Sequence, residues 1–170
     1  MFSKRYFLLF FLALALLPSC KKTEVAYPDV THEWKDIVAF RVNGKPFVMS
    51  GNTSNYHTYG VGITYLPSGL LSIGASNYDN HNDLWMNVRY DKNISSYALD
   101  NDSLGGNYND AGLTDPVLNT QFFTDSLYKG VLNITYFQDH ICAGTFQFDA
   151  INMRGDRIHV TDGRFDITTH

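Results

Sequence analysis

The chain contains little cysteine, little glutamate and no excess of basic charge. Only Cys20 and Cys142 are cysteines, so a framework of disulfide bonds cannot hold the fold together. The formal net charge of −4 argues against a nucleic-acid-binding protein, which would favour a basic face. Glu24 and Glu33 are the only glutamates, and good helix formers are scarce. The sequence therefore excludes a disulfide scaffold and indicates almost no helix.

Signatures of common enzymes are also missing from the sequence. The patterns G-x-S-x-G, H-E-x-x-H and C-x-x-C do not occur, and the histidines are scattered singly. His140 lies two residues before Cys142 and could share its strand face, as in a metal site or a Cys/His nucleophile. We favour the alternative that Cys142 is a small buried hydrophobic residue beside a histidine at a strand end. No catalytic residue is predicted, and we expect a protein that is not an enzyme.

What is present at the N-terminus is typical of a bacterial lipoprotein signal. Lys4 and Arg5 precede an apolar run from Phe7 to Leu17, which is shorter than the roughly 20 residues of a transmembrane helix. The sequence Leu17-Pro18-Ser19-Cys20 then places a cysteine where a signal peptidase would cut. We expect residues 1–19 to be removed and Cys20 to carry several acyl chains, such as palmitate, which together anchor a protein stably. An ordinary secretory signal is the alternative, and both predict export.

The rest of the chain predicts one all-β domain behind a short tether. Residues 20–36 are polar and without period, as in a spacer, and residues 37–170 alternate between apolar and polar positions. Asn43-Gly44 predicts a tight turn between strands at 37–42 and 45–49. Pro67-Ser68-Gly69 predicts a second hairpin, between strands at 59–66 and 70–76. A strand at 84–90 would then turn Leu84, Met86, Val88 and Tyr90 to one face and Trp85, Asn87 and Arg89 to the other.

The second half of the chain continues this pattern after a loop. Asp100–Asn119 is rich in Asn, Asp and Gly and is expected to be a long loop, following a short edge strand at 97–99. Further strands are expected at 121–125, 131–138, 141–150, 157–161 and 163–167. About nine strands with hairpin connections predict an antiparallel fold. Covering its apolar face requires a sandwich or a barrel-like sheet, and we favour the sandwich slightly.

Three segments carry a resemblance to a known group of proteins. They are Ala39-Phe40-Arg41-Val42-Asn43-Gly44-Lys45-Pro46-Phe47, Gly144-Thr145-Phe146-Gln147-Phe148-Asp149-Ala150 and Val160-Thr161-Asp162-Gly163-Arg164-Phe165-Asp166-Ile167. Together they resemble a family of uncharacterised small lipoproteins of Bacteroidota-type bacteria, a domain of unknown function. The resemblance implies an envelope setting, an all-β domain and a lipid anchor, and it implies neither an activity nor a ligand.

Two Asx-rich segments are candidate calcium loops. Asp79 and Asp83 lie in one segment, and Asp100 and Asp102 lie in the other. Clustered carboxylates are typical ligands of calcium, but the glycine and glutamate of an EF-hand loop are missing. Asx-rich turns between strands give the same letters for conformational reasons. Calcium is therefore the best cofactor candidate, and no metal site is assigned.

Trp85 and two serines are candidates for contacts with sugars. If Trp85 points away from the core, its flat ring could stack on a glycan while nearby Asn and Asp hydrogen-bond the hydroxyls. Aromatic residues are also simply favoured in strands. Asp102-Ser103-Leu104 and Asp125-Ser126-Leu127 resemble the acceptor pattern for O-linked glycans on exported proteins of these bacteria, which makes Ser103 and Ser126 candidate glycosylation sites.

These observations predict an envelope-anchored, non-enzymatic binding module. Its membrane contact would be the lipid on Cys20, its ligand or protein partner is not specified, and loops within Asn77–Asp83 and Asp100–Asp110 would form the site. The alternatives are a structural lipoprotein without a small ligand and a carbohydrate-binding accessory protein. A binding module predicts a concave polar patch with aromatic walls, whereas a structural protein predicts a flat docking surface. We expect the protein on the outer membrane, facing the periplasm or the cell surface.

Overall fold

The computed structural model describes residues 28–29, 33, 35–51, 60–77, 82–101, 109–115 and 119–169, and these form eleven strands. The strands are β1 (Ile37–Val42), β2 (Lys45–Ser50), β3 (Gly60–Tyr65), β4 (Leu70–Asn77), β5 (Asn82–Arg89), β6 (Ser96–Leu99), β7 (Asp110–Asp115), β8 (Thr120–Phe123), β9 (Gly130–Gln138), β10 (Ile141–Ile151) and β11 (Arg157–Thr168). The predicted all-β class is confirmed, with eleven strands where about nine were expected.

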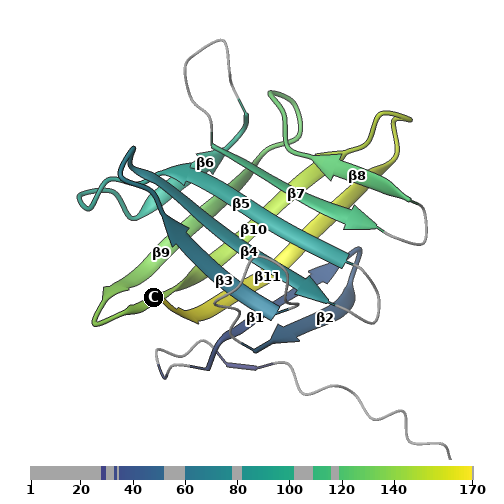
Figure 1. The fold of residues 1–170 in the computed structure, drawn as a ribbon. Coiled ribbons are helices and arrows are strands. Elements are labelled where there is room, and N and C mark those ends of the chain that lie inside the picture. Colours follow the sequence, from purple (N-terminus) through teal and green to yellow (C-terminus); the bar gives the residue numbers. More distant parts are fainter. Residues whose placement is uncertain are drawn as a thin grey trace, which may run out of the picture.

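The strands form one nearly closed, barrel-like antiparallel sheet. Its order is β2-β1-β11-β10-β8-β7-β5-β4-β3, and β9 pairs with both β10 and β6. In Figure 1, strands β3, β4, β5 and β7 form the near layer, and β9, β10 and β11 cross behind them along the opposite diagonal. The two end strands approach each other where the Val61 N–H donates to the Gly51 carbonyl over 2.7 Å. Of the two architectures that the sequence left open, the structure has the barrel-like sheet.

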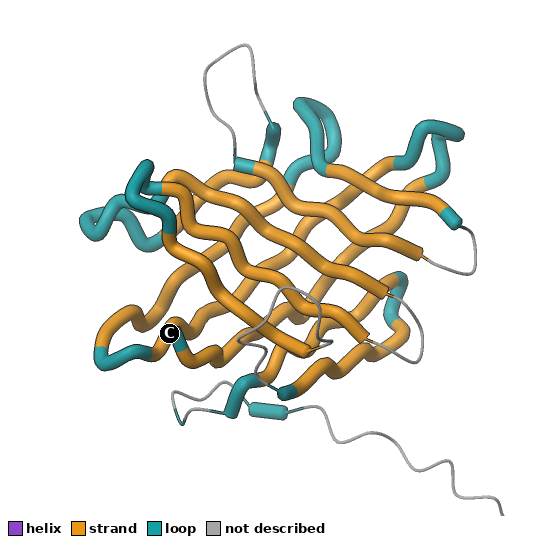
Figure 2. Tube along the Cα trace, viewed as in Figure 1, coloured by secondary structure: helices purple, strands orange, loops and turns teal. Residues whose placement is uncertain are grey.

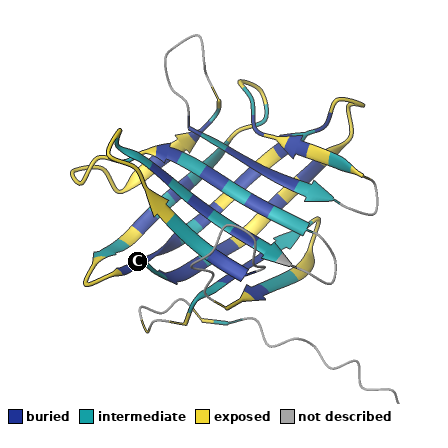
Figure 3. Cartoon of the chain, in the orientation of Figure 1, coloured by how far each residue is buried: buried dark blue, intermediate teal, exposed yellow. Residues whose placement is uncertain are grey.

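Alternating burial along each strand fills the interior with apolar side chains (Figure 3). Leu84, Met86 and Val88 on β5 are buried, whereas Trp85 and Asn87 between them are partly exposed. This is the face assignment that the sequence predicted, because successive side chains of a strand point to opposite sides of the sheet. The largest fully buried side chains include Phe40, Phe122 and Phe165.

Tight turns set the register of the first two hairpins. Asn43 and Gly44 have φ values of 50° and 81°, and Val42 is paired with Lys45 across the turn. Positive φ at both central residues defines the type I′ turn that Asn-Gly favours. The hairpin of β3 and β4 closes over three residues, since the Leu66 N–H donates to the Leu70 carbonyl, and Gly69 in this loop has a φ of 85°. Both predicted hairpins are confirmed, and the loops gather at the ends of the strands (Figure 2).

Two details of the sequence prediction were wrong. The expected loop Asp100–Asn119 contains β7, which pairs with β5 on one side and β8 on the other. The strands expected at 157–161 and 163–167 are one strand, β11, because the chain at Asp162 forms an irregularity in the ladders with β1 and β10 instead of a turn. Asp162 has a φ of 54°, and the extra residue that it contributes is typical of a β-bulge.

The described part of the predicted tether contacts the domain. The Arg164 guanidinium donates to the Pro28 carbonyl, and the Glu33 N–H donates to Asp166 Oδ2 over 2.8 Å. The Thr168 N–H donates to Asp36 Oδ1 over 2.8 Å. Contacts with β11 therefore begin before β1, within the segment expected to be a spacer.

Candidate functional site: a barrel-end groove and an aromatic sheet face

The predicted signal, residues 1–19, and four of the candidate site residues lie outside the described residues. The four residues are Cys20, Asp79, Asp102 and Ser103. Ser126 is exposed in the connection between β8 and β9, next to Leu127, which is 83% exposed. This turn is ordered by Asp125, whose Oδ1 accepts the N–H groups of Leu127 and Tyr128. Ser126 is therefore accessible, as an acceptor for a glycan must be.

The two predicted calcium segments are separated along β5. Asp83 is near the start of β5, where it pairs with Ser76 and Thr114. Asp100 lies near the other end of β5. Its neighbour Asn101 donates its N–H to the Asn109 carbonyl, and Asn109 Oδ1 accepts the N–H of Arg89, the last residue of β5. Six residues of strand span about 20 Å. The structure does not bring Asp83 and Asp100 together, and among the described residues no group of three His, Cys, Asp or Glu could hold a metal ion.

Cys142 is a core residue. Its side chain is fully buried on β10, and burial raises the pKa of its thiol to about 12. The reactive form of cysteine is the thiolate, which this environment disfavours. His140 is exposed in the turn between β9 and β10, where its φ is 63°. The interpretation of Cys142 as a small buried hydrophobic residue is confirmed.

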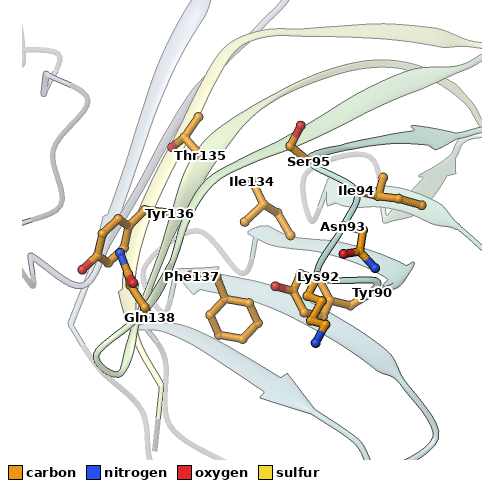
Figure 4. A pocket seen from close by; sticks show the side chains of 10 residues that line it. All are labelled: Tyr90, Lys92, Asn93, Ile94, Ser95, Ile134, Thr135, Tyr136, Phe137 and Gln138. Atoms are coloured by element: carbon orange, nitrogen blue, oxygen red, sulfur yellow. The ribbon is translucent and has the colours of Figure 1, made fainter.

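A groove of about 290 Å³ opens at one end of the barrel (Figure 4). Strand β6 pairs with β9 from Ser96 and Asn133 onward, and the Ile134 N–H still donates to the Ser95 carbonyl over 2.8 Å. Beyond the Ile134–Ser95 hydrogen bond, the groove lies between the segment 90–95 and the end of β9. Ile94, Ile134 and Phe137 supply apolar surface, and Lys92, Asn93 and Gln138 supply polar groups.

Aromatic rings wall this end of the barrel. The ring centroids of Tyr90 and Phe137 are 4.9 Å apart in an edge-to-face arrangement, and Tyr65 stands 5.8 Å from Tyr90. Burial raises the pKa of the Tyr90 hydroxyl, so this group stays protonated well into the alkaline range. Tyr65, Leu66 and Ile94 are 54%, 41% and 47% exposed, and they are three of the six exposed large hydrophobic residues in the described chain. Ile94 lines the groove, and Tyr65 meets the rings of Tyr90 and Phe137 that wall it. Exposed apolar surface at a groove is typical of a binding site.

The segment that forms one wall of the groove is held in shape by its own hydrogen bonds. Asp91 Oδ1 accepts from the Asn93 N–H over 2.9 Å. The Tyr97 hydroxyl lies 2.8 Å from the carbonyl oxygens of both Asp91 and Ile94, and burial raises its pKa. The wall is thus preformed, which reduces the entropy lost when a ligand binds.

Sequence reasoning missed this groove. Half of its lining residues belong to β9, which the sequence placed correctly, and the other half lie in the connection between β5 and β6. The ring contacts of Tyr90 with Phe137 and Tyr65 depend on how distant segments meet. One local signal was available, because Asp91-Lys92-Asn93 is a turn cluster followed by the apolar Ile94. None of the described residues of the predicted loops, Asn77–Asp83 and Asp100–Asp110, lines the groove.

Trp85 belongs to a second surface, on the outer face of the near layer. The ladder pairs Gly62 with Gly74, Gly74 with Trp85, Trp85 with Gly112, and Gly112 with Phe123. Directly paired residues point to the same face of a sheet, so these five positions form one row across five strands. The rings of Trp85 and Phe123 meet edge to face at 5.6 Å, and Phe123 is 38% exposed. The predicted outward orientation of Trp85 is confirmed.

No family model matches this chain, and neither curated proteins nor solved structures give a match. In the described part of the chain, no helix is long and apolar enough to cross a membrane.

Proposed function

We propose that this protein is an envelope-anchored lipoprotein whose β domain is a non-enzymatic binding module, and that its ligand enters the barrel-end groove. The anchor is proposed from the signal-like residues 1–19 and from Cys20, together with the resemblance to small Bacteroidota-type lipoproteins. The proposed location is the outer membrane, with the domain facing the periplasm or the cell surface.

The groove is the observation that carries this proposal. A binding module requires a concave surface with apolar walls and a few polar groups that orient the ligand. The rings of Tyr90 and Phe137 supply the walls, and Lys92 and Asn93 supply polar groups. A volume of about 290 Å³ suits a small ligand or one to two side chains of a protein partner.

The chemistry of the groove favours binding over catalysis. Its titratable groups are Lys92 and the hydroxyls of Tyr90 and Tyr136, and the buried thiol of Cys142 is held neutral. His159 Nδ1 lies 2.6 Å from Asp149 Oδ1, but this pair is exposed on the outer face of β10 and β11. Asp149, which pairs with His159, lies six residues along β10 from Ala143, and Ala143 is the residue that pairs with Tyr136 of the groove. The pair therefore contributes nothing to the groove.

A thermal-shift screen of the purified protein tests the binding proposal. The panel contains calcium, EDTA, soluble glycans and short peptides, because a ligand that binds the native state raises the melting temperature. Ile94→Glu places a charge at the groove mouth, and Leu127→Glu makes the same change at an exposed site outside it. A rise that Ile94→Glu abolishes and Leu127→Glu retains supports the proposal. No rise with any class would leave the structural lipoprotein as the better hypothesis.

The anchor is tested separately by labelling with palmitate in a bacterial host. Wild-type protein is expected to incorporate the label and to sediment with membranes, and Cys20→Ala is expected to lose both properties because the acceptor thiol is gone. Retained label in Cys20→Ala would contradict the assignment of Cys20.

A further inference from the structure

We propose that the outer face around Trp85 binds a neutral sugar ring of a polysaccharide, at a site distinct from the barrel-end groove. This inference stands on the ladder register and on the packing of Trp85, and it does not depend on the groove having a ligand.

The indole of Trp85 lies over the neighbouring strand on one side only. A Cβ atom at Gly112 would lie 2.2 Å from Trp85 Cζ2 and 2.6 Å from Cε2, so the ring covers the backbone of β7 at this point. On the other side, a Cβ atom at Gly74 would have no heavy atom within 4 Å. The next position in the row is Gly62, which also has no side chain. Among the described residues, the sheet beside the indole is therefore bare backbone at Gly74 of β4, which leaves room for a ligand against the aromatic ring.

Hydrogen-bonding side chains stand in the rows above and below Trp85. One row pairs Ser76 with Asp83 and Asp83 with Thr114. The other pairs Ser72 with Asn87 and Asn87 with Asp110, and the Asn87 amide donates to Asp110 Oδ1 over 2.9 Å. These rows lie two residues away along the strands, roughly 7 Å on either side of the indole.

A pyranose matches this arrangement in both shape and polarity. Its C–H face is apolar and packs on an aromatic ring, and its equatorial hydroxyls point outward in the ring plane. Serine, threonine and asparagine both donate and accept hydrogen bonds, and carboxylates accept them. The two rows can therefore both donate hydrogen bonds to the sugar hydroxyls and accept hydrogen bonds from them. The fixed Asn87–Asp110 pair orients one row before any ligand arrives.

The charge of the two rows that flank Trp85 favours a neutral sugar over an acidic one. Asp83 and Asp110 place two carboxylates in the rows that flank Trp85. A uronic acid or a sulfated sugar in contact with these rows would be repelled by like charge. The same carboxylates strengthen hydrogen bonds from the hydroxyls of a neutral sugar, because an ionised acceptor binds more tightly than a neutral one.

Two substitutions separate the site from the fold. Trp85→Ala removes the platform. Gly74→Val leaves the platform in place and covers the bare backbone beside it, at a position where a Cβ atom meets nothing and a β-branched residue is favoured in a strand. Gln147→Val is the matched control, because it also introduces a valine at an outward position of a strand, but on β10 in the opposite layer.

Affinity electrophoresis of the full-length protein in mild detergent tests the proposal, with laminarin, soluble starch, mannan or xylan in the gel and alginate as the acidic contrast. Wild type and Gln147→Val are expected to be retarded by at least one neutral polysaccharide and not by alginate. Trp85→Ala and Gly74→Val are expected to raise the apparent Kd at least tenfold. Absence of retardation in all four neutral gels, retardation by alginate alone, or retention of binding by either variant would overturn the proposal.

Discussion

The two glycines on either side of Trp85 give opposite predictions for the same substitution. Alanine at position 112 would bring its Cβ atom to 2.2 Å from the Trp85 ring and to 2.7 Å from the Phe122 carbonyl oxygen. Alanine at position 74 would meet no heavy atom within 4 Å. Both positions are paired directly with Trp85, one on β7 and one on β4. The pair therefore isolates the effect of packing from the effect of removing a glycine.

The expected magnitudes follow from these distances. Ordinary contact begins near 3.4 Å, so Gly112→Ala must move the indole by about 1 Å and must also displace backbone, which typically costs about 1–3 kcal/mol. Gly74→Ala has room for the methyl group and reduces the freedom of the unfolded chain, which stabilises by about 0.4–1 kcal/mol. The two variants are therefore expected to differ by about 1.4–4 kcal/mol in the free energy of unfolding. In a chain of this length the melting temperatures would differ by roughly 3–16 °C.

Urea denaturation followed by circular dichroism measures both free energies. Repeating Gly112→Ala in a Trp85→Ala background removes the clash with the ring but leaves the clash with the Phe122 carbonyl. The double mutant is therefore expected to recover part of the loss and not all of it. The reasoning is refuted if Gly112→Ala unfolds within 0.5 kcal/mol of wild type, on the order of ordinary surface substitutions, or if Gly74→Ala is equally destabilising.

Three further changes test the thiol, a turn and the core. Burial raises the pKa of the Cys142 thiol from 9.0 to about 12, so the unfolded state loses this proton first, and the free energy of unfolding is expected to fall above pH 9 by up to about 1.4 kcal/mol per pH unit. Urea denaturation between pH 8 and 11 is expected to show a steeper decline in wild type than in Cys142→Ala, and equal slopes would contradict the prediction. Asn43→Ala is expected to lower the free energy of unfolding by about 1–2 kcal/mol, because φ at position 43 is 50° and Asn43 Oδ1 accepts the His159 N–H. A loss under about 0.5 kcal/mol in urea denaturation would be inconsistent with this prediction. Phe122→Ala removes a ring that is 2% exposed and is expected to lower the free energy of unfolding by about 3–5 kcal/mol, or to prevent folding; a smaller loss would mean that the core repacks around the cavity.

Local signals account for the parts of the fold that sequence reasoning predicted. Asn43-Gly44 suits only a few turn types, and one of them fixes the register of the hairpin it closes. Alternation over Leu84–Val88 orients β5, because a shift by one residue would place every apolar side chain in water. The buried state of Cys142 followed from the apolar residues that alternate with it along β10.

Strand β7 escaped prediction because its stability comes from its neighbours. Asp110–Asp115 contains a glycine and two aspartates, and its own propensity for a strand is low. Only two of its residues, Ala111 and Leu113, supply apolar side chains to the core. Pairing with β5 and β8 and the cover that Trp85 gives to Gly112 hold it in the sheet. Such tertiary contributions are not visible in a window of six residues.

The groove and the Trp85 face could not be predicted for a related reason, since each is assembled from strands far apart in the sequence. The row from Gly62 to Phe123 exists only once the register of five strands is known, and the groove exists only once the segment 90–95 meets the end of β9. Because the groove side chains lie at a barrel end and the Trp85 row lies on the outer face of one layer, a substitution at Ile94 leaves the Trp85 row intact, and Gly74→Val leaves the groove intact. The two proposed ligands can therefore be tested independently in one protein, and a ligand lost in both variants would indicate a general effect on folding and not occupation of either surface.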